Sequence, residues 1–153
     1  MPDVDVHSGG CQCGAVRYET TGQPSKTAVC HCRYCQTRTG SAFGISVYFP
    51  TQAVTQLQGA LKDYAFTTVS GGTFTTRFCT NCGTSVFWNL TVFPELTGIA
   101  GGTFDPPSFW YELKREVFTR TQAPFVQIDA IEKFETSAAF CPVQADPTHL
   151  RGE

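Results

Sequence analysis

The sequence predicts one mainly β domain of short, twisted antiparallel sheets, with metal-binding turns at the tips of hairpins. Three observations lead to this: short runs of alternating polar and apolar residues, turns rich in glycine, and cysteines paired at close spacing inside turns. At 153 residues with 41% apolar residues, the chain is long enough to bury a core. We expect the domain to span residues 1–140 and a polar tail to occupy 141–153.

Two predicted hairpins carry paired cysteines at their tips. Alternation on both sides of residues 10–14 predicts the first, and strands at 73–78 and 84–88 around turn 79–83 predict the second. Further strands are expected where β-branched and aromatic residues gather, at 27–29, 41–49, 54–57, 61–69, 96–104 (interrupted by Gly101-Gly102) and 125–131. Residues 112–118 fit a helix or a strand equally well. Residues 33–39 form a helical turn or a loop that ends at Gly40, and Ser70-Gly71-Gly72 is the strongest hairpin turn.

Charge and hydropathy exclude several function classes. With 11 Lys and Arg and a formal net charge of −2, the chain lacks the basic surface that nucleic-acid binding requires. No apolar run approaches the roughly 18 residues of a membrane span, and the acidic N-terminus carries no apolar core of a signal peptide. We therefore expect a cytoplasmic protein, in which eight cysteines are metal ligands rather than disulfides.

Two of the cysteine clusters share one pattern, in which a pair of cysteines is followed by glycine. They are Gly10-Cys11-Gln12-Cys13-Gly14 and Phe78-Cys79-Thr80-Asn81-Cys82-Gly83. Gly14 and Gly83 supply a positive φ, which lets each loop fold back onto the sulfurs. Four thiolates from two such turns would saturate a structural zinc. Iron is a less favoured occupant, and the alternative is four buried free thiols.

The middle cluster, Cys30-His31-Cys32-Arg33-Tyr34-Cys35, lacks the trailing glycine and offers three thiolates. Three protein ligands leave the fourth position of a second zinc open to a water or an external thiolate, so we expect Cys30, Cys32 and Cys35 to form the catalytic site. Zinc with three thiolates carries a net charge of −1, and a guest thiolate would make it −2. The alternatives are that Cys141 closes the site as a fourth ligand, or that no metal binds.

Other conspicuous side chains are expected to be structural. Strand alternation points His31 away from the neighbouring cysteines, which favours a hydrogen-bonding role in the core. Arg33, Arg38 and Arg77 lie close in sequence to the clusters and could offset their negative charge, although solvated surface positions are the more common role of such residues. The aromatic residues at strand spacing are expected to be core rather than a binding box, namely Phe43, Tyr48, Phe49, Tyr64, Phe66, Phe74, Phe78, Phe87 and Trp88.

In order and spacing, the three clusters resemble those of the glutathione-dependent formaldehyde-activating enzymes, also called the centromere protein V family. The resemblance covers roughly residues 6–134. It implies the Mss4-like fold, a structural zinc on Cys11, Cys13, Cys79 and Cys82, and a second, open zinc site on Cys30, Cys32 and Cys35. Where the family commonly has a histidine–tryptophan-type segment and a Pro-Trp pair, this sequence has 115–118 (Arg-Glu-Val-Phe) and Pro124-Phe125.

The resemblance also implies an activity. In the family, glutathione and formaldehyde condense to S-hydroxymethylglutathione, which is a carbon–sulfur lyase reaction when run in reverse. We therefore expect a two-zinc, carbon–sulfur lyase-like enzyme whose partner is a small thiol such as glutathione. The alternative is a zinc-stabilised thiol carrier or protein-interaction module without turnover, because a fold alone does not fix a function.

Overall fold

Two sheets and one short helix make up the protein, as seen in a computed structural model that describes residues 3–130 and 132–152. The smaller sheet has the strand order β1-β2-β5, with bounds Val6–Gly10, Arg17–Thr21 and Val54–Gln58. The larger sheet has the order β11-β10-β3-β4-β9-β8-β7-β6. Its strands, in chain order, are β3 (Lys26–Cys30), β4 (Gly44–Pro50), β6 (Leu61–Thr67), β7 (Thr73–Cys79), β8 (Ser85–Leu90), β9 (Leu96–Ala100), β10 (Arg115–Val117) and β11 (Glu132–Lys133).

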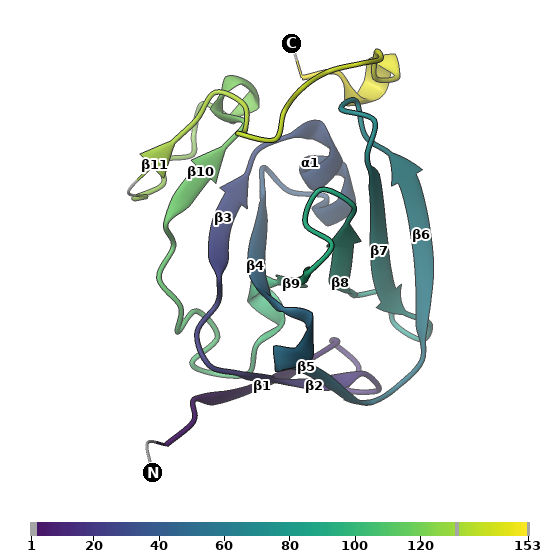
Figure 1. The fold of residues 1–153 in the computed structure, drawn as a ribbon, viewed down its shortest axis with the longest axis vertical. Coiled ribbons are helices and arrows are strands. Elements are labelled where there is room, and N and C mark those ends of the chain that lie inside the picture. The colour runs from purple at the N-terminus through teal and green to yellow at the C-terminus, as the bar shows by residue number, and fades with distance from the viewer. Residues whose placement is uncertain (1–2, 131, 153) are drawn as a thin grey trace.

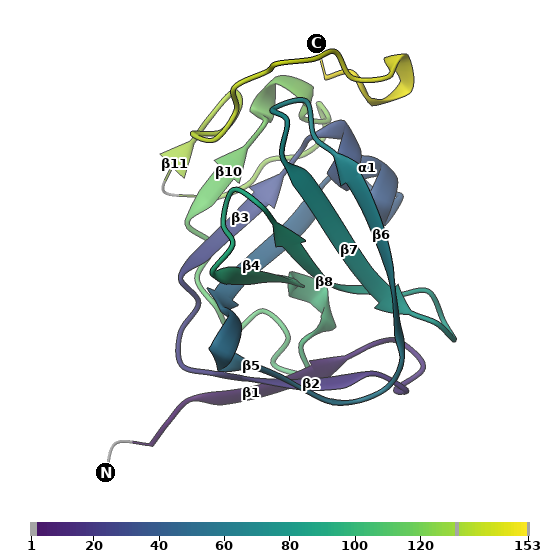
Figure 2. The same ribbon diagram turned by 45° about the vertical axis from the view of Figure 1, so that its right-hand side comes forward.

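The larger sheet bends so that its two ends face each other. In Figure 1, β10 and β11 stand on one side and β6 and β7 on the other, with α1 (Arg33–Thr39) between them at the upper end. The smaller sheet closes the lower end (Figures 1 and 2). All pairings in the larger sheet are antiparallel except those of β10, which runs parallel to β3 and β11. Four 3₁₀ turns complete the described elements: Thr51–Ala53, Gly101–Thr103, Thr119–Thr121 and Thr148–Leu150.

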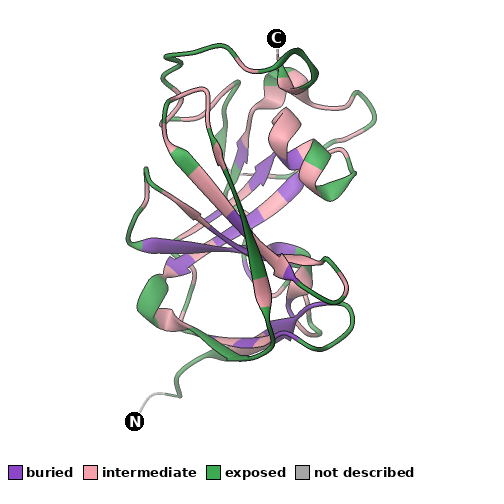
Figure 3. Cartoon of the chain, turned by 90° about the vertical axis from the view of Figure 1, so that its right-hand side faces the viewer, coloured by how far each residue is buried: buried purple, intermediate pink, exposed green. Residues whose placement is uncertain are grey.

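Side chains from both sheets share one hydrophobic core. Tyr18 of β2 is fully buried and meets Phe87 of β8 edge to face, with ring centroids 5.2 Å apart. Its hydroxyl lies 2.8 Å from Thr103 Oγ1, so burial leaves no polar atom of this ring unpaired. Phe49 and Ile99 are fully buried in β4 and β9, and each contributes about 1.5–3 kcal/mol through burial. Figure 3 shows the buried positions where the central strands cross.

Helix α1 is short, and both of its ends are capped. Cys32 has extended backbone angles, and its Sγ accepts a hydrogen bond from the Cys35 N–H at 3.4 Å, so this cysteine is the N-cap. Gly40 ends the helix in the left-handed region, at φ 62°, and its N–H donates to Gln36 O. The helix predicted as one of two possibilities for residues 33–39 is therefore present, and it ends at Gly40 as expected.

The C-terminal segment crosses the open end of the larger sheet above α1, as Figures 1 and 2 show. The Cys141 N–H donates to Ser70 Oγ at 3.0 Å, which fastens the segment to the β6–β7 turn. The Tyr34 hydroxyl donates to Asp146, which fastens it to α1. The C-terminal segment is therefore held at two places, by the β6–β7 turn and by α1.

The sequence-based strand predictions are confirmed in part. Both cysteine hairpins, the turn at 70–72 and the interruption of 96–104 at Gly101 are present, and residues 112–118 contain the strand β10. The strand predicted at 125–131 is wrong for 125–130, and residue 131 lies outside the described ranges. There the chain turns instead, because the Val126 N–H donates to Ala123 O and Phe125 is 82% exposed. Tyr64 is also not core, since it is 61% exposed on the edge strand β6.

Candidate metal centres

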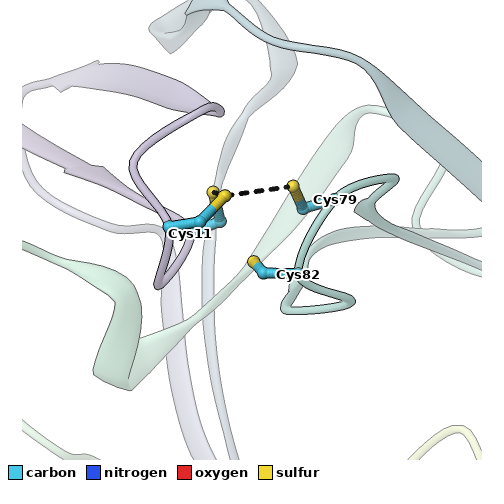
Figure 4. A group of neighbouring side chains, drawn as sticks. Cys11, Cys79 and Cys82 are labelled. Atoms are coloured by element: carbon cyan, nitrogen blue, oxygen red, sulfur yellow. Dashed lines mark hydrogen bonds between the residues drawn. The ribbon is translucent and has the colours of Figure 1, made fainter.

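Four cysteines from two hairpin tips come together at the lower end of the molecule. Cys11 and Cys13 lie in the β1–β2 turn, and Cys79 and Cys82 lie at the β7–β8 turn, 66 positions further along the chain. Their sulfur atoms all lie within 4.8 Å of one another. Figure 4 shows Cys11, Cys79 and Cys82 pointing toward one another from the two loops. The turns therefore present one four-sulfur cluster.

The backbone of each turn wraps around its own sulfurs. Gly14 and Gly83 both adopt φ of 78°, which confirms the positive φ predicted for them, and a side chain at either position would be strained. In the first turn, the Val16 N–H donates to Cys11 Sγ at 3.2 Å. Such bonds stabilise a thiolate, which is the form that binds metals.

Thr84 links the two turns and favours ionisation of Cys82. Its Oγ1 accepts a hydrogen bond from the Gln12 N–H at 3.2 Å, across the gap between the turns. Its hydroxyl also lies 3.2 Å from Cys82 Sγ. The hydrogen bond from the Thr84 side chain is the main reason why the pKa of Cys82 falls to about 5. Cys82 is therefore ionised at neutral pH.

The spacing of the four sulfurs fits a tetrahedral metal. Zinc–sulfur bonds of about 2.3 Å require sulfur–sulfur edges of about 3.8 Å. The Cys11–Cys13 and Cys13–Cys79 sulfur distances are 3.5 and 3.8 Å. A set of four thiols at this spacing could hold a metal ion and would leave no position free on it.

Three further cysteines form a second cluster where β3 meets α1. Cys30 ends β3, Cys32 caps α1 and Cys35 lies in the first turn of that helix. Their sulfurs lie within 4.8 Å of one another, and no fourth histidine, cysteine or carboxylate in the described ranges belongs to the group. The cluster could hold a metal ion with three protein ligands. Cys141, the fourth ligand considered from the sequence, is exposed and belongs to neither cluster.

The electrostatics of this trio favour one thiolate. Hydrogen bonds from the thiols of Cys30 and Cys32 hold the pKa of Cys35 well below its ordinary value, and the charge of Arg38 lowers it further. Hydrogen bonds with Cys32 and with Cys35, together with burial, hold the pKa of Cys30 well above its ordinary value. Arg38 lies over the Trp88 ring, 4.2 Å from its centroid, and a Cβ at residue 44 would come within 2.6 Å of its Nη2. Gly44 thus leaves the room that the guanidinium occupies.

The trio lines a cavity of about 1550 Å³ between the two ends of the larger sheet. One wall is a stack of rings, in which Tyr34 lies 4.8 Å from Phe66 and Phe66 lies 5.2 Å from Phe74, centroid to centroid. Five cations and one carboxylate line it, namely Lys26, Arg33, Arg38, Arg115, Arg120 and Asp146. The cavity therefore combines an aromatic wall with an excess of positive charge. Residues 137–141 of the C-terminal segment also line it.

Comparison with known proteins identifies the family. Residues 6–121 match the family described as glutathione-dependent formaldehyde-activating enzyme. The chain belongs to this family. A crystal structure of a Rhodobacter sphaeroides protein is similar, with a TM-score of 0.52 and 23% identity over 69% of this chain and 96% of that chain. At that identity the likeness concerns the fold, and it supports the mainly β, Mss4-like architecture. The helices of the described ranges are all too short or too polar to span a lipid bilayer.

Sequence reasoning missed two residues that connect to His31, namely Glu116 and Lys133. His31 is fully buried, and its Nε2 lies 2.7 Å from Oε1 of Glu116, which is also fully buried. Lys133 Nζ lies 3.2 Å from the other carboxylate oxygen. The hydrogen-bonding role expected of His31 is therefore seen, and its ring points away from the trio. Glu116 lies in residues 115–118, where the sequence departs from the family pattern. That departure was the one feature of the sequence that could have drawn attention to Glu116.

The predicted positions of the arginines and aromatic residues are confirmed for some side chains and wrong for others. Arg77 forms an exposed ion pair with Asp63, at 3.7 Å. Arg38 is not a solvated surface charge, because its Nη2 is buried beside the trio. Phe49, Phe87 and Trp88 are buried as expected. Five rings predicted to be core line the cavity instead, namely Tyr48, Tyr64, Phe66, Phe74 and Phe78.

Proposed function

We propose that the chain is a zinc-dependent, carbon–sulfur lyase-like enzyme that acts on a small thiol adduct of the S-hydroxymethylglutathione type. Residues 1–140 would form the catalytic domain, and 141–153 its polar tail. We place the protein in the cytoplasm, where a reducing environment keeps its cysteines available to metals. Its partner would be a small thiol such as glutathione, and its net negative charge argues against a nucleic acid.

The observation that carries the proposal is the three-sulfur cluster lining a large cavity without a fourth ligand among the described residues. A metal held this way keeps a position for a guest, which is typical of catalytic rather than structural zinc sites. The excess of cations around the cavity suits a guest that carries carboxylates, as glutathione does. The family match over residues 6–121 supports the same chemistry.

The four-sulfur cluster has a separate role in this proposal. Cys11, Cys13, Cys79 and Cys82 would hold a structural zinc that fastens the β1–β2 turn to the β7–β8 turn. A saturated site of this kind adds to folding free energy and does not take part in turnover.

At the reacting site, Cys30, Cys32 and Cys35 would hold the second zinc, which supplies the positive charge that keeps a guest thiol ionised at neutral pH. In the forming direction, the guest sulfur bonds to the aldehyde carbon, and the proton from the thiol ends on the new hydroxyl group. The reverse direction breaks the same carbon–sulfur bond. Arg38 offsets negative charge beside Cys35, and the ring wall of Phe66 and Phe74 shields one side of the cavity.

The test is a titration of glutathione into the zinc-loaded protein, with and without ¹³C-formaldehyde. Binding is followed by calorimetry and adduct formation by NMR. We expect saturable binding and adduct formation faster than in buffer alone. Cys32→Ser should abolish both and remove one zinc per chain. Cys141→Ser is the matched control, since this cysteine lies outside the trio, and it should keep the full zinc content.

Two results would contradict the proposal. Saturable thiol binding without any acceleration of adduct formation would instead assign a thiol carrier. One zinc per wild-type chain, with no thiol binding, would leave only a zinc-stabilised scaffold.

A further inference from the structure

Glu116 is a carboxylate buried without any exposure in β10. Burying a carboxylate is costly unless partners replace its lost water. Strand pairing does not require this charge, because the adjacent cross-strand pair of β10 and β11, Arg115 with Glu132, already supplies an exposed ion pair. The position of Glu116 therefore calls for an explanation beyond sheet formation.

The two oxygens of Glu116 have different partners. Oε1 lies 2.7 Å from His31 Nε2, a hydrogen bond in which a carboxylate accepts and a ring N–H donates. Oε2 lies 3.2 Å from Nζ of Lys133, the residue paired with Glu116 across the β10–β11 register. Glu116 thus connects a buried histidine to a lysine at the sheet edge.

His31 stands between two members of the trio in the sequence, and both its backbone N–H and its backbone carbonyl form hydrogen bonds. Its N–H donates to Val117 O at 3.1 Å, and its carbonyl accepts from Thr121 Oγ1 at 2.8 Å. The bond from its ring to Glu116 adds a third attachment, 85 positions away in sequence. Glu116 pairs with Val29 and Val117 pairs with Cys30, so Cys30 lies on the opposite face of the sheet from the Glu116 side chain that holds the His31 ring.

We propose that Glu116 is a positioning residue, which acts through His31 to hold Cys30 and Cys32 at the spacing that binds the metal of the three-cysteine cluster. The inference rests on the proposed metal at that cluster, but not on turnover. Hydrogen-bond partners that orient metal ligands typically change metal affinity 10–100-fold when removed. In the part of the chain that the structure describes, no hydrogen bond or ion pair joins the four-cysteine cluster to Glu116, so that cluster is an internal reference in the same chain.

The experiment measures the affinity of both clusters for zinc by competition with a chelator, and for cobalt by its thiolate absorption bands. In Glu116→Ala we expect zinc affinity at the trio to fall 10–100-fold, while that of the four-cysteine cluster is unchanged. Glu116→Gln keeps an acceptor for His31 and should retain part of the affinity. Glu132→Gln is the matched control, because it removes the neighbouring carboxylate of the β10–β11 pairing and should change neither cluster.

Several outcomes would overturn the proposal. A lower melting temperature in Glu116→Ala, with the ratio of the two affinities unchanged, would make Glu116 purely structural. If Glu116→Ala fails to fold, an unchanged affinity ratio in Glu116→Gln and in Lys133→Gln would have the same meaning. A wild-type chain whose trio binds no metal would overturn both this inference and the proposed function, whereas a normal wild-type trio with an unaffected Glu116→Ala overturns the inference alone.

Discussion

Replacing Cys82 and Cys32 by serine tests the difference between the two clusters most directly. Both cysteines are half-buried, so the two changes remove similar amounts of buried surface. Serine at position 32 can still cap α1, since serine is a favoured N-cap residue. The comparison therefore isolates what each cluster contributes to the fold.

The expected loss of stability follows from the contribution that a saturated zinc site makes to folding. A saturated structural zinc is worth on the order of 10 kcal/mol of folding free energy, which is comparable with the whole stability of a domain. Forfeiting even half of that contribution lowers the melting temperature by about 10–20 °C, at about 2–4 °C per kcal/mol for a chain of this length. We expect this drop for Cys82→Ser and less than about 4 °C for Cys32→Ser.

The assay is thermal unfolding followed by circular dichroism, with one equivalent of zinc per chain so that the four-cysteine cluster is filled first. Zinc content is measured on the same samples. Equal drops in melting temperature for the two variants, or a larger drop for Cys32→Ser, would refute the assignment of a sealed cluster at the hairpin tips.

Two further changes test the packing and the surface charge. A Cβ on Gly98 would lie 2.1 Å from Nε1 of the fully buried Trp88, so Gly98→Ala should cost about 1–3 kcal/mol in urea unfolding. Gly102→Ala, where the nearest atom is 4.0 Å away, should cost far less. Arg17 donates to Asp105 at 3.0 Å and lowers the pKa of that carboxyl below its ordinary value of 3.8. Since both groups are partly exposed, Asp105→Asn should cost no more than about 1 kcal/mol at neutral pH. The stabilisation is present above pH 3.8 and is lost as the pH falls through the lowered pKa, so unfolding curves of variant and wild type should converge in acid.

The parts of the site that the sequence predicts are those with a local cause. A cysteine pair followed by glycine specifies a turn within five residues, so the positive φ of Gly14 and Gly83 could be stated beforehand. The opposed directions of His31 and its neighbouring cysteines follow from strand alternation in the same way. Local rules also place the helix end at Gly40.

The parts that escaped prediction depend on contacts between distant segments. Glu116 reaches His31 only because β10 pairs in parallel with β3. A strand of three residues is too short to show a periodic pattern from which that pairing could be predicted. Phe66 lies on the cavity wall because the larger sheet bends, which turns an interior-looking ring toward the trio. Such positions are decided by topology rather than by composition.

Residues 137–152, which cover the cavity above the trio and are called the ceiling here, lie outside the part of the chain that matches the family. The family match ends at residue 121, whereas Phe140 and Asp146 line the cavity from above and the tail is tied to the β6–β7 turn at Ser70. Agreement among relatives in their cysteine clusters therefore carries no information about the shape of this ceiling. A screen for the physiological thiol is better ordered by the size and charge that fit under residues 137–152 than by the motifs that place the chain in its family.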